Sequence, residues 1–170
     1  MGQIRKTVAF NVFAADQSWA GVTSGFKSPD MERKMEAVQV GGVDGELEHD
    51  MGANGPLVVN HKYVGQVPEL LKEFGAAKRD GAKLRFVAVV QDDAGRAIQH
   101  EIVVQGQHKK ISRPEVKTGE PGETEFETTC VYYREEFDGQ LVFEIDRPNH
   151  VFKVGETDIL EEQRRILGIA

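Results

Sequence analysis

The chain has 170 residues, of which 39% are hydrophobic, and its 28 acidic residues outnumber 21 basic ones to give a net charge of −7. This composition excludes an intrinsically disordered chain and predicts one domain over residues 1–170 with a core of its own. The acidic balance argues against a nucleic-acid-binding surface, which needs clustered lysine and arginine, and the single cysteine excludes an intrachain disulfide.

The N-terminal run VAFNVFAA follows Arg5 and Lys6 and therefore has the outline of a secretion signal. The run is short, contains Asn11 and is followed directly by Asp16, so a strand is the better interpretation. Nowhere does an apolar run approach the roughly 20 residues that span a bilayer. The sequence thus predicts a protein that is made in the cytoplasm and does not bind membranes.

Three segments in the first half of the chain are typical of strands. They are TVAFNVFA (7–14), MERKMEAVQV (31–40) and LVVNHKYVG (57–65). Between the last two lies GGVDGELEHDMG (41–52), whose alternating acids suggest a calcium loop. An EF-hand loop needs glycine at its sixth position and glutamate at its twelfth, whereas counting from Asp44 those positions hold His49 and Gly55. We therefore interpret 41–52 as an extended, glycine-rich segment without a metal.

Two segments have the apolar spacing of helices. VPELLKEFG (67–75) has a proline suited to the first helical position and ends on a glycine. In TDILEEQRRILG (157–168), Asp158 can cap the helix with Glu161 three residues on, and a glycine again follows the last turn. The predicted apolar stripes are Leu70, Leu71 and Phe74 in the first helix, and Ile159, Leu160, Ile166 and Leu167 in the second.

A long hairpin is predicted from KLRFVAVVQ (83–91) and AIQHEIVVQGQHKKI (97–111), joined by DDAGR. Period-two alternation places one set of apolar residues on a dry face: Leu84, Phe86, Ala88, Val90, Ile98, Ile102 and Val104. The opposite face of the second strand is wet and carries Gln99, Glu101, Gln105, Gln107 and Lys109.

A second hairpin is predicted from TEFETTCVYYREEF (124–137) and QLVFEID (140–146). Asp138-Gly139 between two apolar-rich runs is typical of a two-residue turn, in which both central positions need positive φ. This turn sets a register in which Tyr132 faces Ile145 and Arg134 faces Phe143.

The residues that carry chemistry in other proteins form no catalytic or metal-binding pattern here. His100 and His108 lie eight strand residues apart, at about 3.3 Å per residue, and cannot share a metal. Cys130 lies mid-strand beside no histidine and is interpreted as a small buried apolar residue. We expect no enzyme activity and no cofactor.

Together the segments predict a mainly β, α+β protein: an antiparallel β sandwich or barrel with one short internal helix and a C-terminal helix. Their order also resembles a known family through a set of motifs. These are QSWAGV (17–22), MERKMEAVQVGGVDG (31–45), DMG (50–52), PELLKEFG (68–75), VYYREEFDGQLVFEID (131–146) and ILGIA (166–170). The family is the major tail tube protein of contractile phage tails and R-type pyocins, to which the tube protein of type VI secretion is related.

The resemblance implies a structural subunit of hexameric rings, which stack into a hollow tube inside a contractile sheath. Strands of neighbouring subunits would continue one sheet around the lumen. The implied partners are other copies of the chain and the sheath, tape-measure, baseplate and tail-terminator proteins. DNA, if the tube belongs to a phage, or another cargo would only pass through, and a negatively charged lumen would let DNA slide.

Two sets of residues are candidates for assembly and transport. Segment 41–52 is either a docking arm that engages a neighbouring subunit or a free surface hairpin; its candidate contacts are Gly41, Gly42, Asp44, Gly45, Glu46, Asp50, Met51 and Gly52. The wet row Gln99, Glu101, Gln105, Gln107 and Lys109 faces either the lumen or the outside. An alternative function is a β-sandwich adaptor or carbohydrate-binding module whose binding face holds Trp19, Tyr132 and Tyr133.

Overall fold

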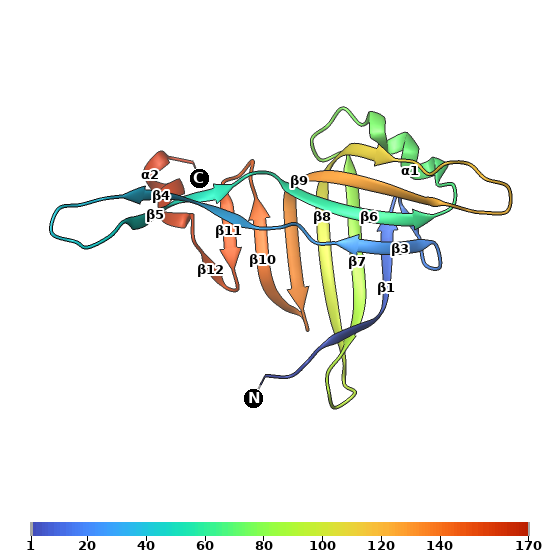
Figure 1. Cartoon of the computed structure of the whole chain (residues 1–170), viewed down its shortest axis with the longest axis horizontal. Coiled ribbons are helices and arrows are strands. Elements are labelled where there is room, and N and C mark those ends of the chain that lie inside the picture. The colour runs from blue at the N-terminus through green and yellow to red at the C-terminus, as the bar shows by residue number, and fades with distance from the viewer. Residues whose placement is uncertain (1, 170) are drawn as a thin grey trace.

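The structure is a computed structural model that describes residues 2–169, and it consists mainly of antiparallel strands with two short helices (Figure 1). The strands are β1 (Lys6–Ala14), β2 (Gln17–Ser18), β3 (Thr23–Lys27), β4 (Glu32–Val38), β5 (Leu47–Asn54), β6 (Leu57–Val64), β7 (Ala82–Gln91), β8 (Ala97–Ser112), β9 (Glu123–Phe137), β10 (Gln140–Asp146), β11 (Val151–Val154) and β12 (Thr157–Asp158). The helices are α1 (Pro68–Lys72), followed by the 3-10 turn η1 (Glu73–Gly75), and α2 (Glu161–Leu167).

The main sheet has the strand order β12-β11-β10-β9-β8-β7-β1-β2 and does not close on itself. β6 pairs with both β3 and the first half of β9, which adds a second, smaller layer. Strands β4 and β5 form a separate hairpin that projects from the rest of the chain (Figure 1). The mainly antiparallel fold is as predicted. The sequence predicted a sandwich or a barrel, and in the single chain the main sheet stays open and does not form a closed barrel.

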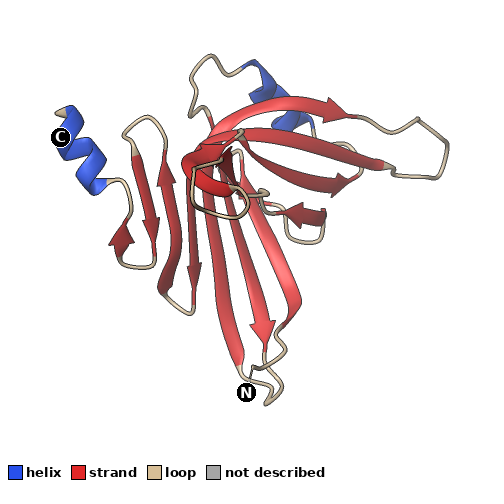
Figure 2. Cartoon of the chain, turned by 60° about the vertical axis from the view of Figure 1, so that its left-hand side comes forward, coloured by secondary structure: helices blue, strands red, loops and turns tan. Residues whose placement is uncertain are grey.

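The two layers arise because β8 and β9 are long and bend together (Figure 2). Their register shifts between Gln105 and Gly106, where the backbones come very close. A Cβ on Gly106 would lie 1.9 Å from the carbonyl oxygen of Thr129, so only glycine fits. Beyond this bulge β9 leaves β6 and pairs with β10.

The core lies between the two layers and is built from the dry faces that the alternation predicts. In β7 and β8 the predicted apolar residues are buried: Leu84, Phe86, Ala88, Val90, Ile98, Ile102 and Val104. Trp19 closes one end of the core, where its Nε1 donates to the Ala14 carbonyl at 2.9 Å and its ring packs edge-on against Tyr63. Cys130 is buried as predicted, at 4% exposure.

The β9–β10 hairpin has the predicted turn but not the predicted register. Asp138 and Gly139 adopt φ of 53° and 74°, as a two-residue turn of this type requires. A bulge between Leu141 and Phe143 then shifts the pairing by one residue. As a result Arg134 faces Glu144, where the sequence predicted Phe143, and the predicted pairing of Tyr132 with Ile145 is likewise wrong.

Both predicted helices exist, but each is shorter and less buried than its pattern indicates. In α1 Pro68 occupies the first turn and Leu70 is fully buried, whereas Phe74 of the predicted stripe is 52% exposed. α2 begins at Glu161 and its N-cap is Leu160, so the predicted cap at Asp158 is wrong. No residue of Glu161–Leu167 is buried, because α2 follows β12 at the edge of the main sheet.

Candidate interaction surfaces

The predicted docking segment is the tip and return strand of the β4–β5 hairpin, which we name the arm (residues 32–54). Every residue of β4 is exposed, and in β5 only Gly52 is partly covered. The arm extends away from the two-layered body (Figure 1). The eight candidate residues are thus brought together on one projecting element.

The base of the arm is fixed by one carboxylate. Asp50 accepts a hydrogen bond from the backbone N–H of Gly52 at 2.9 Å and pairs with Arg33 on the opposite strand. The Gly52 hydrogen bond and the neighbouring Arg33 guanidinium hold the pKa of Asp50 below its usual value. Gly52 has φ of 100°, a conformation that other residues rarely adopt. Asp50 and Gly52, two of the predicted contacts, therefore also shape the arm.

The arm carries more exposed apolar side chains than a solvated hairpin needs. The exposed fraction of these apolar residues runs from 41% at Val38 to 57% at Met51. The set is Met35, Val38, Val40, Val43, Leu47 and Met51. Apolar side chains gathered on one projecting element are typical of a surface that a partner covers.

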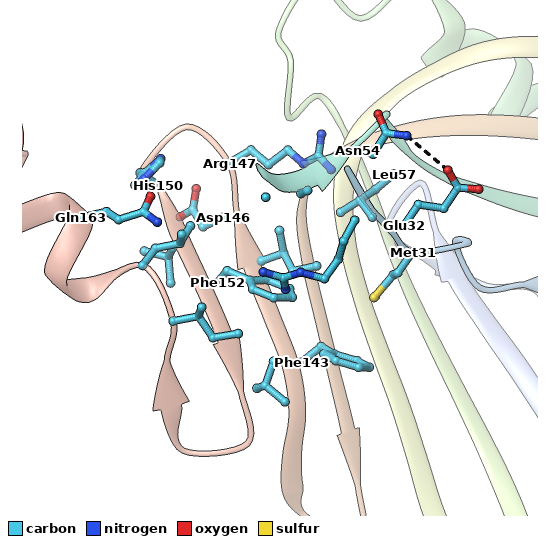
Figure 3. A pocket seen from close by; sticks show the side chains of 18 of the residues that line it. Met31, Glu32, Asn54, Leu57, Phe143, Asp146, Arg147, His150, Phe152 and Gln163 are labelled. Carbon is cyan, nitrogen blue, oxygen red and sulfur yellow. Dashed lines mark hydrogen bonds between the residues drawn. The ribbon is translucent and has the colours of Figure 1, made fainter. Parts of the chain in front are cut away.

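An open groove of about 880 Å³ lies between the base of the arm and the β10–β11–α2 end of the main sheet (Figure 3). Phe143 and Phe152 line it from the sheet, and Met31 and Leu57 line it from the arm side. Strands β10 and β11 extend the apolar face of the main sheet beyond the part that the β3–β6 layer covers. The groove is therefore an apolar sheet face that this chain leaves partly uncovered.

Helix α2 is attached to this end of the sheet by polar contacts. Arg164 donates to the His150 carbonyl at 2.9 Å and to the Asp158 carboxylate at 2.6 Å. The Arg164 contact is the main reason that the pKa of Asp158 lies below its usual value. Ile166 and Leu167 of the predicted stripe are 74% and 62% exposed, so these two apolar side chains do not pack into the core of this chain.

The predicted wet row lies on the side of β8 that faces away from the core. Gln99, Glu101 and Gln105 belong to the main sheet, where they alternate with buried residues. Gln107 lies beyond the bend, and its side-chain amide donates to the Ala76 carbonyl at 2.9 Å. Lys109 is exposed on the same side. The side of β8 that carries these polar residues faces away from the core, as the alternation predicts. The bend at Gly106 separates Gln99, Glu101 and Gln105 from Gln107 and Lys109.

Polar and charged residues from five strands continue this face across the main sheet, and we name the set the polar wall. It consists of Arg85, Gln99, Glu101, Gln105, Tyr132, Arg134, Glu136, Glu144 and Lys153. Arg85 contacts Glu101 at 3.2 Å, and Arg134 contacts Glu136 on its own strand. The wall mixes both signs of charge and is not the uniformly negative surface that net charge alone suggests.

Sequence reasoning missed a buried polar cluster between the layers. His61 hydrogen-bonds to Tyr63 through Nδ1 and to Thr128 through Nε2, each at 2.8 Å. His108 also contacts Thr128 at 2.8 Å and reaches Glu73 of η1 at 3.2 Å. Alternation could have placed His61 and His108 on inward faces, but not beside each other.

Within residues 2–169, no group of three or more His, Cys, Asp or Glu side chains is placed to hold a metal ion. Neither described helix has the length and apolar character needed to cross a membrane. The binding face of the adaptor alternative is wrong: Trp19 and Tyr133 are buried in the core at 8% and 0% exposure, and Tyr132 lies on the opposite face of the sheet.

Comparison with known proteins decides the family. The family model described as phage tail tube protein FII matches residues 4–168. The chain belongs to this family. It is 31% identical over 172 residues to the tail tube protein of Escherichia phage P2, an alignment that covers 99% of this chain and all of the relative.

A solved structure supports the fold. The sheath/tube terminator of PVC, an extracellular contractile injection system studied by cryo-EM in its extended state, matches with a TM-score of 0.56 at 12% identity. The match covers 76% of this chain and 94% of the terminator. The resemblance inferred from the motifs is thus confirmed at the level of family. Members are structural components of phage tails and not enzymes.

Proposed function

We propose that the chain, acting as one tail-tube domain, forms hexameric rings that stack into the inner tube of a contractile tail or tail-like particle. The tube is a conduit for DNA or other cargo inside the sheath. The partners are the chain itself, the sheath, the tape-measure protein, the baseplate and the tail terminator. Membership of the tail tube family supports a structural tube subunit.

The observation that carries the proposal is that the main sheet is open at both ends. Along β1 the residues Lys6–Phe10 pair with β7 on one side only, because β2 pairs only with Phe13 and Ala14. At the other end β12 pairs only with Lys153 and Val154 of β11. Unpaired edges join readily to another strand, and different surfaces at opposite ends of one subunit generate rings or filaments.

The arm and the groove supply a second pair of surfaces. We propose that the arm docks on a neighbouring subunit in the same ring or the next, so that its exposed apolar side chains become covered. The groove end of the sheet is the matching apolar surface of the same chain. Hiding such surfaces by association is favourable by about 25 cal/mol per Å² of apolar area.

Shortening the arm tests its role in assembly. Val38 pairs with Leu47, so an Asn-Gly turn in place of residues 39–46 keeps the hairpin and removes its tip. The variant is expected to fold with an unchanged melting temperature and to form no tubes by negative-stain electron microscopy. Long, normal tubes from this variant would refute arm docking.

A matched pair of substitutions separates docking from a general loss of apolar surface. Val43 at the arm tip is 45% exposed, and Val116 in the loop after β8 is 85% exposed. Val43→Asp is expected to block assembly, whereas Val116→Asp is expected to leave it intact. Wild-type protein that stays a single subunit at high concentration would contradict the tube itself.

We propose that the polar wall lines the lumen, with Gln99, Glu101, Gln105, Gln107 and Lys109 on that side. A thiol test is available because Cys130 is buried and burial raises the pKa of its thiol to about 12, which makes it unreactive. Gln105→Cys in assembled tubes should react with a small maleimide but not with one coupled to a folded carrier protein. Equal reaction with both reagents would place the wall outside.

A further inference from the structure

The bulge in β10 creates a charge cluster on the polar wall. It places Glu144 directly opposite Arg134 of β9, and Glu144 also pairs with Lys153 of β11 on its other side. A regular hairpin would have set Phe143 opposite Arg134. The bulge thus brings one carboxylate between two cations from the two neighbouring strands.

Glu144 uses both oxygen atoms. Oε1 accepts a hydrogen bond from the Tyr132 hydroxyl at 3.0 Å and lies 3.8 Å from Arg134, while Oε2 lies 3.6 Å from Lys153 Nζ. The Glu144 side chain is 18% exposed, against 40% for each cation. The Glu144 carboxylate is therefore more deeply buried than the two positive groups and draws them toward the backbone of the sheet.

The other arginine of the wall is neutralised in the same way. Arg85 contacts Glu101 at 3.2 Å, and Gln99 donates to the same carboxylate oxygen at 3.1 Å. Arg134 has a second carboxylate, Glu136. Arg85, Arg134 and Lys153 are thus each next to a carboxylate from this face of the sheet.

We propose that Glu144 masks Arg134 and Lys153 so that duplex DNA passing along the wall is not retained. The inference rests on the proposed function, in which the wall lines the channel. Duplex DNA presents one negative charge per 1.7 Å of axis, and a protein binds it by replacing counterions with lysine and arginine. A cation whose charge is cancelled by an adjacent carboxylate provides little of this attraction. Local pairing, rather than the net charge of −7, keeps the wall non-adhesive.

The test compares open-ended tubes of the wild type, Glu144→Gln and Glu125→Gln in co-sedimentation with a short fluorescent duplex DNA. Glutamine keeps the size and the hydrogen bond from Tyr132 but removes the charge. Glu125→Gln is the matched control, because Glu125 contacts Lys62 at 4.0 Å on the second layer. The control therefore frees a lysine without touching the wall.

We expect Glu144→Gln tubes to retain DNA at least about tenfold more tightly than wild type at low salt. The slope of log affinity against log salt should steepen by about 0.9 for each freed cation that contacts a phosphate. Adding Arg134→Gln and Lys153→Gln to this variant should return retention to the wild-type level. Glu136→Gln, which removes the nearer of the two carboxylates beside Arg134 and leaves Lys153 paired, should give a smaller rise and serves if Glu144→Gln does not assemble.

Each result has a distinct meaning. Intact Glu144→Gln or Glu136→Gln tubes that retain no more DNA than wild type would overturn the inference but leave the proposed function standing. An equal rise with Glu125→Gln would overturn it too, since the effect would then be one of total charge. Wild-type protein that forms no tubes would overturn the proposed function and the inference with it.

Discussion

The imidazoles of His61 and His108 share one hydroxyl group, each 2.8 Å from Thr128 Oγ1. The carboxylate of Glu73 accepts a hydrogen bond, so His108 Nε2 must donate to it. In the neutral state His108 Nδ1 then accepts from Thr128, which in turn accepts from His61 Nε2–H. His61 Nδ1 finally accepts from the Tyr63 hydroxyl. The chain of hydrogen bonds has one direction, and it requires both histidines to be neutral.

Acid is therefore expected to destabilise the fold. Burial lowers the pKa of His61 to about 3, with a smaller effect from His108, and burial also lowers the pKa of His108. Unfolded histidine titrates at about 6.5, so below that pH the unfolded state binds more protons than the folded state. The contribution of a neutral His61 is complete above a pH of about 6.5 and is lost as the pH falls toward 3, by roughly 1 kcal/mol per pH unit, and His108 changes stability in the same direction.

Urea denaturation at a series of pH values between 7 and 4 measures this loss. The exposed His49 supplies the control, because His49→Gln should leave the pH dependence unchanged. A free energy of unfolding that stays constant over the series would contradict a buried, neutral histidine pair.

Removing the shared hydroxyl should cost stability at neutral pH. Thr128→Val keeps the side-chain shape but leaves His61 Nε2 and His108 Nδ1 without their partner. Each buried unsatisfied group costs about 1–3 kcal/mol, so for the two groups we expect a loss of about 2–6 kcal/mol in chemical denaturation. Thr129→Val, next along the strand on the opposite face, should change stability by less than about 1 kcal/mol. Equal effects at both positions would show that the hydroxyl is not important.

A methyl group at the bend should prevent the two layers from forming. Gly106→Ala would place its Cβ 1.9 Å from the Thr129 carbonyl oxygen, and neither strand backbone can move without breaking the bulge. We expect a loss of more than about 4 kcal/mol or insoluble protein. Gly41→Ala is the control, because nothing lies within 4 Å of its added Cβ. A soluble Gly106→Ala protein with wild-type melting temperature would refute the close approach.

Charged substitutions in the two helices should have opposite outcomes. Ile166→Lys changes a side chain that is 74% exposed, so the free energy of unfolding of the single subunit should stay within about 0.5 kcal/mol of wild type. Leu70→Lys in α1 places a charge at a fully buried position and should abolish folding. Thermal denaturation monitored by circular dichroism distinguishes the two. Marked destabilisation by Ile166→Lys would mean that α2 packs on the body after all.

Much of the fold was accessible from sequence because it depends on near neighbours. Alternation in β7 and β8 identified the buried face, and Asp138-Gly139 identified a turn that needs two positive φ angles. Gly168, with φ of 68°, ends α2 where the sequence predicted. The glycine-rich segment 41–52 was also recognised as an arm or hairpin, since its composition is incompatible with a packed core.

The interaction surfaces needed the tertiary structure. The bulge between Leu141 and Phe143 decides that Arg134 meets Glu144, and no local preference in the sequence marks that position. His61 and His108 are brought together only because β6 and β8 both flank β9. The apolar stripe of α2 looks like a core pattern, yet the helix lies beyond the last strand of the sheet.

The sequence by itself therefore determined most of the longer strands, the turn at Asp138-Gly139 and the family that the chain resembles, because backbone sterics and side-chain periodicity act over a few residues. Only the tertiary structure decided the cross-strand register, the bend at Gly106, the buried histidine pair and the uncovered apolar groove. Each of these depends on how segments far apart in the chain pack against one another.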